Sequence, residues 1–263
     1  MDTHSRNFLK SLLAVWPPHT VATSAWLEKH GISRFLKQRY LKSGWVKSLG
    51  YGAIARAYEQ VDWPGGLWAL QTQTELPVHV GGKSAFALQG SSHYIRFGQE
   101  ELSLFMPRET KLPRWFLEGA WSVTLQVVKT NFLDPHLGLT DLSVSGINVK
   151  ISSLERAALE ILYLAPKRET YGEINLLFES LNLLRPDLIQ ELLMNCKNSK
   201  VIRLFLYLGE THQHPWFSQL DLDKICLGAG VLQLSKGGVF IKKYQMTVPK
   251  ELTNKEENEG NLF

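Results

Sequence analysis

The chain has 263 residues, 44% of them hydrophobic and 21% charged, which is typical of a globular protein large enough for two domains. It has no stretch of about eighteen consecutive apolar residues and no charged-then-apolar N-terminus, so we expect neither a membrane-spanning helix nor a secretory signal. Its two cysteines, Cys196 and Cys226, lie far apart. This spacing fits a protein of the reducing cytoplasm better than a disulfide-stabilised exported one.

The surplus positive charge lies in the first quarter of the chain. Residues 1–60 contain nine basic and three acidic residues, a net charge of +6, whereas the remainder contains 20 basic and 22 acidic residues, a net charge of −2. A localised positive surplus is typical of a surface that binds a polyanion such as DNA, although a solvated basic face has the same composition.

Residues 8–31 predict two helices. Apolar residues recur at helical spacing from residue 8 to residue 16, and Pro17-Pro18 end that helix. Thr23 or Ser24 can cap a short second helix through a hydroxyl group, and Gly31 supplies the left-handed residue that ends it.

A third helix and a hairpin complete the predicted module. Ser33 can cap a helix that continues to residue 43. Residues 45–56 then place two apolar segments around the turn Gly50-Tyr51-Gly52, which predicts a two-stranded hairpin. Because a hairpin directly after a helix-turn-helix is the wing of a winged helix, we expect a DNA-binding domain over residues 1–60.

The third helix is predicted to have one packed and one DNA-facing side. At about 100° per residue, Ile32, Phe35, Leu36 and Tyr40 share the side expected to pack on the first two helices, with Arg39 close to it. Basic and amide side chains fall opposite and can contact phosphates and base edges. We expect Arg34, Lys37, Gln38 and Lys42 in the groove, and Ser33, Lys47, Tyr51 and Arg56 at the DNA backbone or minor groove.

The rest of the chain predicts an α/β part over residues 61–150 and a helical part over residues 151–248 that ends in a β-hairpin, so the fold class is α+β. Ser145-Gly146 and Gly237-Gly238 are the predicted hairpin turns, and residues 152–155 are a predicted capping box. A Glu- and Asn-rich tail over residues 249–263 is predicted to be disordered. The other predicted helices are 66–74, 83–89, 188–196 and 201–208, and the other predicted strands are 78–80, 102–106 and 123–129.

Short blocks in a fixed order carry a resemblance to a known family. They include Tyr40-Leu41-Lys42-Ser43-Gly44-Trp45, Val78-His79-Val80-Gly81-Gly82, Arg203-Leu204-Phe205-Leu206 and Gly237-Gly238. In these blocks the chain resembles the AbiEi-type antitoxins, the transcriptional regulators of type IV toxin–antitoxin systems.

The resemblance implies a winged helix that binds inverted repeats of double-stranded DNA in its own promoter and represses the operon. It also implies a C-terminal region that counteracts a nucleotidyltransferase-like toxin encoded beside it, and the type IV label implies no stable complex between the two proteins. That C-terminal region resembles a nuclease-like scaffold that has lost its site. We therefore expect no catalytic residue, cofactor or metal.

Four motifs that look catalytic or metal-binding are weak. Gly82-Lys83-Ser84 lacks the first glycine of a phosphate-binding loop. Glu109-Thr110-Lys111, with Asp62 as an imagined partner, resembles a nuclease motif but lies in a proline-flanked loop. Asp221-Leu222-Asp223 lacks a nearby Gly-Ser pair, and His212-Gln213-His214 lacks further zinc ligands.

Two alternative functions remain at this point. The helix-turn-helix could hold a protein partner instead of DNA, and a metal-dependent nuclease is the less favoured alternative. A second basic cluster is either a solvated face or a second surface for DNA or toxin, and it consists of Lys197, Lys200, Arg203, Lys242 and Lys243.

Overall fold

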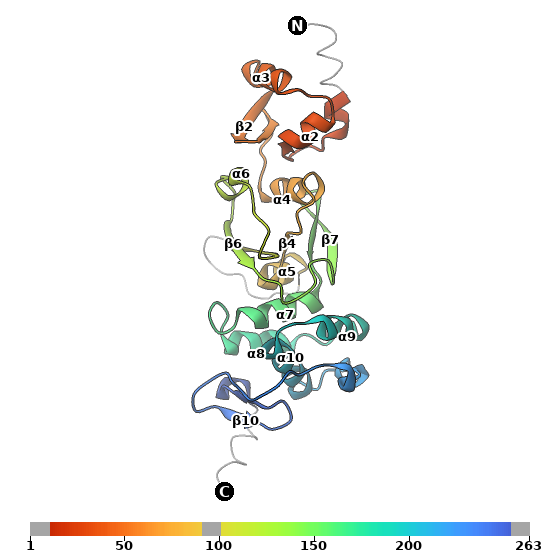
Figure 1. The fold of residues 1–263 in the computed structure, drawn as a ribbon, viewed down its shortest axis with the longest axis vertical. Helices are drawn as coiled ribbons and strands as arrows, with labels where there is room; N and C mark the ends of the chain where they lie inside the picture. Colours follow the sequence, from red (N-terminus) through yellow and green to blue (C-terminus); the bar gives the residue numbers. More distant parts are fainter. Residues whose placement is uncertain (1–10, 91–100, 254–263) are drawn as a thin grey trace. The chain divides into compact units, whose positions relative to one another are not determined.

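The computed structural model describes residues 11–90 and 101–253 and confirms an α+β fold (Figure 1). The N-terminal part follows the predicted order, although its first helix, predicted from residue 8, is described only from residue 11. Three antiparallel strands form a sheet in the order β1-β3-β2. The elements after the first helix are β1 (Ala22–Thr23), α2 (Ser24–Lys29), α3 (Arg34–Lys42), β2 (Val46–Gly50) and β3 (Ala53–Arg56).

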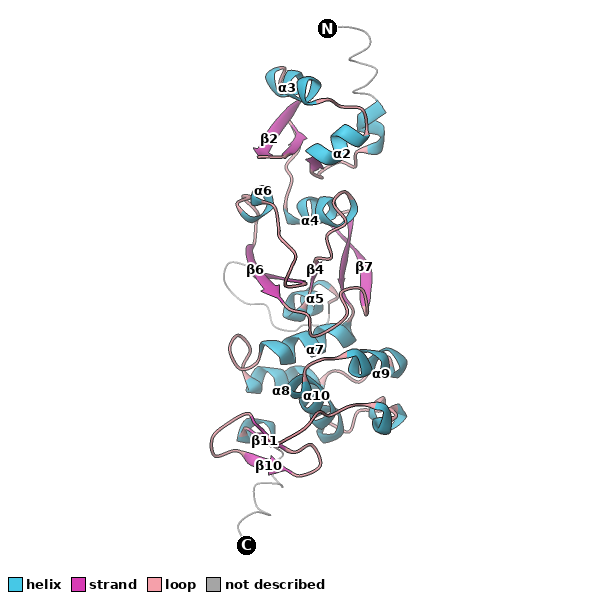
Figure 2. Cartoon of the chain, viewed as in Figure 1, coloured by secondary structure: helices cyan, strands magenta, loops and turns pink. Residues whose placement is uncertain are grey.

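A five-stranded mixed sheet follows in the order β6-β5-β4-β8-β7 (Figure 2). β4 pairs antiparallel with β5 and parallel with β8, and β5 pairs parallel with β6. The strands are β4 (His79–Val80), β5 (Glu101–Met106), β6 (Thr124–Lys129), β7 (Leu139–Val144) and β8 (Ile147–Ser152). Helix α4 (Trp63–Thr72) precedes β4, and α6 (Arg114–Leu117) lies between β5 and β6 along the chain.

Local turn chemistry explains how β7 and β8 are joined. Ser145 and Gly146 both have positive φ, 52° and 80°, as a tight two-residue hairpin turn requires, so the hairpin predicted there is confirmed. The side chain of Gln71 on α4 then ties two segments together, because its Nε2 donates to the carbonyls of Val78 and Lys150 at 2.8 and 3.0 Å.

The helical part has a continuous apolar core. α7 begins after Ser153, whose Oγ accepts from the Arg156 amide at 3.4 Å, so the cap lies one residue later than in the predicted capping box. α8 was not predicted, although Thr170 caps it and Ile174 and Phe178 are buried at helical spacing. The helices are α5 (Gly82–Leu88), α7 (Leu154–Leu164), α8 (Tyr171–Glu179), α9 (Pro186–Asn195) and α10 (Ser199–Thr211).

The described C-terminal segment differs from its prediction in two ways. The antiparallel hairpin is β10 (Val239–Ile241) with β11 (Met246–Val248), and it turns at residues 242–245, not at Gly237-Gly238. β9 (Leu232–Gln233) pairs parallel with β11, so it cannot be the first arm of a hairpin. The predicted disorder is wrong for η3 (Lys250–Leu252), where Leu252 is buried, and residues 254–263 lie outside the described residues. Two short 3₁₀ helices, η1 (Phe217–Gln219) and η2 (Leu222–Lys224), precede this sheet.

The chain divides into two compact units that interleave along the sequence. The first contains residues 1–80, 96–129 and 140–151, and the second contains residues 81–95, 130–139 and 152–263. The chain therefore passes from one unit to the other five times. No helix in the described ranges is long and apolar enough to cross a membrane.

Candidate nucleic-acid interface

Side-chain caps fix the beginnings of α2 and α3. Thr23 Oγ1 accepts from the Trp26 amide at 3.3 Å, and Ser33 Oγ accepts from the Leu36 amide at 3.2 Å, as predicted for both residues. Gly31, with φ of +77°, makes the turn between the helices. The two helices then pack on one core, which consists of Leu12, Trp16, Ala22, Leu27, Ile32, Tyr40, Val46 and Ile54.

The wing is a hairpin with an exposed aromatic tip. Gly50 and Gly52 have φ of +123° and +89°, backbone angles that residues with a side chain rarely adopt. Tyr51 between them is 95% exposed. The Ser24 amide donates to the Gly52 carbonyl at 2.8 Å, which ties the wing turn to the start of α2. The wing is therefore fixed against the helix-turn-helix.

The outward face of α3 consists of Phe35, Gln38, Arg39 and Lys42, all exposed and related by i, i+3, i+4 and i+7. Phe35 was predicted to be packed, and that prediction is wrong, because its side chain is 75% exposed. Arg39 was expected nearer the apolar side but is also exposed. The spacing of Arg39 from Gln38 and Lys42 in the sequence was the signal that could have shown that Arg39 is exposed.

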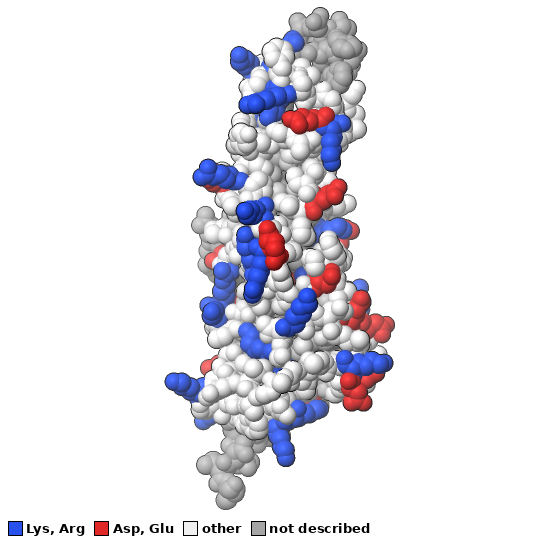
Figure 3. Space-filling view, in the orientation of Figure 1, with Lys and Arg blue, Asp and Glu red and all other residues white. Residues whose placement is uncertain are grey.

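A groove of about 580 Å³ lies between α3 and the wing. Arg34, Lys37 and Gln38 line it from α3, and Glu28 and Tyr51 line it from α2 and the wing. Lys37 is only partly exposed, and its Nζ donates to Ser24 Oγ at 2.8 Å. Figure 3, in the orientation of Figure 1, shows basic side chains on the part that carries α3, with acidic side chains beside them.

Arg56 has a structural role in the winged helix. Its guanidinium donates to the carbonyls of Leu13 and Trp16 and pairs with Glu59 at 3.1 Å, and it lies over the Trp16 ring. These contacts join the last strand of the wing to the first helix. The predicted DNA-contacting residues that the structure leaves exposed are Ser33, Arg34, Gln38, Lys42, Lys47 and Tyr51.

The second basic cluster does not form one surface. Arg203 is 1% exposed, and its guanidinium donates to main-chain carbonyls that include those of Leu227, Gly230 and Gln245. Burial, together with the charge of Lys167, lowers the pKa of Lys200 to about 8. Lys200 donates to the carbonyls of Tyr163 and Ala165, Lys243 pairs with Glu210, and Lys197 and Lys242 are exposed.

Asp62 and the two histidines considered for metal chemistry have hydrogen-bond partners within the protein. Asp62 caps α4 by accepting from the Trp63 amide at 2.7 Å, and it also accepts from the amide and hydroxyl of Ser122. His212 and His214 contact Asn175 and Asn182 at 3.0 and 2.9 Å. Across residues 11–90 and 101–253, no group of three His, Cys, Asp or Glu side chains is placed to hold a metal ion.

A carboxylate of the protein itself occupies the start of α5, where a phosphate-binding loop would hold its ligand. The Gly82 amide donates to Glu160 Oε2 at 2.9 Å, and Lys83 pairs with Glu169 and Glu173. Burial opposes ionisation of Glu173, but its hydrogen bond from Lys83 is the larger influence and holds its pKa below the ordinary value. Because the Gly82 amide and Lys83 already have acidic partners within the protein, we interpret this motif as structural.

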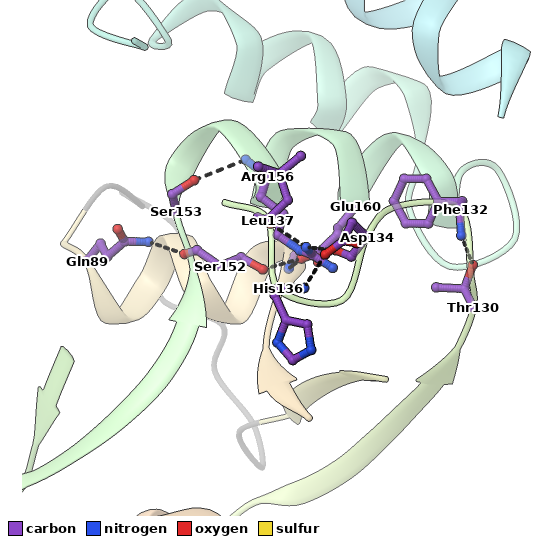
Figure 4. Close-up of polar contacts among 11 residues, drawn as sticks. Gln89, Thr130, Phe132, Asp134, His136, Leu137, Ser152, Ser153, Arg156 and Glu160 are labelled. Atoms are coloured by element: carbon purple, nitrogen blue, oxygen red, sulfur yellow. Dashed lines mark hydrogen bonds and ion pairs between the residues drawn. The ribbon is translucent and has the colours of Figure 1, made fainter. Parts of the chain in front are cut away.

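Glu160 is also the centre of a buried polar network in the second unit (Figure 4). Its carboxylate is fully buried and accepts from Arg156 Nε at 2.8 Å and from Ser152 Oγ at 2.7 Å. The Arg156 guanidinium in turn donates to the carbonyls of Asp134 and Leu137. The network therefore joins α5, α7 and the segment 130–139.

Comparisons with known proteins agree with this architecture. A family model described as "Transcriptional regulator, AbiEi antitoxin N-terminal domain" matches residues 5–97, and one described as "Transcriptional regulator, AbiEi antitoxin, Type IV TA system" matches residues 99–249. The crystal structure of the RV2827C protein from Mycobacterium tuberculosis has a similar fold, with a TM-score of 0.58 and 17% sequence identity over 99% of this chain and 96% of that one. The comparison with curated proteins gave no match. The chain belongs to the AbiEi antitoxin family, the transcriptional regulators of type IV toxin–antitoxin systems.

Proposed function

We propose that this antitoxin binds inverted repeats of double-stranded DNA in its own promoter through α3 and the wing, and so represses its operon. The observation that carries the proposal is the outward face of α3. The side chains of Gln38, Arg39 and Lys42 are exposed there, and the structure gives them no hydrogen bond or ion pair to another described residue. Cations and amides on an exposed helix beside a wing can contact phosphates and base edges in a major groove.

The wing supports the same proposal. Lys47 and Tyr51 are exposed on the hairpin that is hydrogen-bonded to the start of α2, so they would contact the DNA backbone beside the groove that α3 occupies. We propose no DNA contact for Arg56, because its guanidinium is bound within the winged helix.

We further propose that the second part of this function is to counteract a nucleotidyltransferase-like toxin encoded beside the gene, without a stable complex. Both proposed activities would take place in the cytoplasm, where promoter DNA is found. Co-expression of the chain with the neighbouring toxin would test this part separately, because growth should be restored even by a variant that cannot bind DNA.

Fluorescence anisotropy with the DNA upstream of the gene and a random duplex of equal length would test DNA binding. The wild type should prefer the upstream DNA, and its affinity should fall steeply with salt because each neutralised phosphate releases counterions. Lys42→Gln should weaken binding and reduce the slope of log affinity against log salt by about 1. Lys42→Glu should weaken binding further, although a carboxylate in the last turn of α3 also opposes the helix dipole.

Lys242→Gln is the matched control, since Lys242 is also exposed but lies outside the winged helix. It should leave affinity and salt slope unchanged. If the wild type bound neither duplex, the helix-turn-helix would be a protein-interaction module. If the upstream DNA bound but Lys42→Gln had no effect, the assignment of α3 to the groove would be wrong. Intact DNA after incubation with magnesium or manganese would speak against a nuclease.

A further inference from the structure

An apolar side chain lies at the N-terminal end of the polar outward face of α3. Phe35 is the second residue of this helix and is 75% exposed, and Gln38, Arg39 and Lys42 follow it on the same face at helical spacing. A phenylalanine in this position has no hydrogen-bonding group, so it cannot bind a phosphate or pair with a polar base edge.

The fold does not require a phenylalanine at this position. Ile32, just before α3, and Tyr40 of α3 are each 1% exposed in the core of the winged helix, and Leu36 of α3 packs against that core. These residues anchor α3 on the core, and Phe35 is not among them. Since little of the Phe35 side chain is buried, its contribution to folding is small.

The chemistry of the major groove indicates what such a side chain can contact. Each thymine presents a 5-methyl group there, and this is the apolar feature of the base edges in the groove. Residues near the N-terminus of a recognition helix are the ones that reach base edges. Phe35 is at that end of α3, and the neighbouring Arg34 and Arg39 are charged and exposed, as binding to a phosphate-lined groove requires.

We propose that Phe35 is a specificity-determining residue that packs on the 5-methyl group of thymine in the operator. This inference rests on the proposed binding of α3 to DNA and adds a base preference to it. Phe35 would thus make the apolar contact with the bases, and it is not one of the basic and amide residues of α3 that the sequence predicts at the groove.

The test compares thymine with uracil, which differ only by this methyl group. The upstream DNA is amplified once with dTTP and once with dUTP, and affinities for the two duplexes are measured by fluorescence anisotropy. The wild type should bind the thymine duplex more tightly, by about fourfold for each methyl group contacted. Phe35→Ala should bind both duplexes equally and with the lower affinity, whereas Phe35→Leu should keep part of the preference.

Tyr58→Ala is the matched control, because Tyr58 is a 99% exposed aromatic residue of the same segment but lies outside α3. It should keep the full preference for thymine, and thermal melting should show that all three variants fold. If the ratio of the affinity for the thymine duplex to that for the uracil duplex were the same for wild type and Phe35→Ala, the inference would be overturned, whether that ratio were large or close to one. Failure of the wild type to bind either duplex would instead refute the proposed function, so the two failures are distinguishable.

Discussion

Replacement of Glu160 by glutamine should strongly destabilise the second unit. The substitution keeps the size of the side chain but removes the charge that compensates Arg156, and both side chains are almost completely buried. Breaking a buried ion pair by removing one partner costs about 3–5 kcal/mol, because the remaining charge cannot reach water. With a urea m-value of about 2 kcal/mol/M, the midpoint of unfolding should fall by roughly 2 M.

Urea unfolding followed by circular dichroism measures this effect, and two further variants make it specific. Asp141→Asn makes the same chemical change in the exposed pair of Asp141 with Lys150, so it should cost no more than about 1 kcal/mol. Arg156→Met combined with Glu160→Gln should recover at least about 1 kcal/mol relative to Glu160→Gln, because no unpaired charge remains. A loss below about 1 kcal/mol for Glu160→Gln would refute the reasoning, since the carboxylate would then not be needed for Arg156.

Two other predictions follow from local surroundings. Gly172→Ala should stabilise the protein by about 0.4–1 kcal/mol, since nothing lies within 4 Å of the added methyl group. Gly209→Ala should destabilise it by about 1–3 kcal/mol, because the added methyl group would overlap the Trp216 ring. Thermal melting of both variants would test this pair of predictions, and equal shifts in melting temperature would contradict it. Burial raises the pKa of Glu155, but several hydrogen bonds, the largest of them from Arg185, together outweigh burial and hold the pKa below the ordinary value of 4.5. The pair with Arg185 therefore stabilises the fold above that pH and loses its effect as the pH falls. Urea midpoints at pH 6 and pH 3 should therefore differ less for Arg185→Gln than for the wild type, and an equal difference would show that the pair is not responsible.

Short-range signals identified the winged helix. Hydroxyl caps at Thr23 and Ser33, the left-handed Gly31 and the glycines of the wing act within a few residues of the chain, so the sequence alone indicates where each element begins and ends. The Ser145-Gly146 turn was predictable for the same reason.

Long-range contacts decided the features that were not predicted. Arg203 looks like an exposed cation in the sequence, but its carbonyl partners lie 24 to 42 residues away, on a segment whose path cannot be predicted locally. Phe35 looks like a core residue, but Ile32, before α3, and Tyr40 occupy the core while Phe35 is exposed. The parallel pairing of β9 with β11 likewise depends on a partner that is distant in sequence.

The interleaving of the two units has a consequence for genetic dissection of this antitoxin. Because the chain passes between the units five times before residue 153, a truncation from either terminus that cuts the chain between residues 81 and 151 removes parts of both. Loss of the proposed toxin neutralisation in such a truncated protein would therefore not locate that activity in the missing segment. Point substitutions such as Lys42→Gln, which leave every strand of both units in place, are the means to separate the proposed promoter binding from the proposed neutralisation of the toxin.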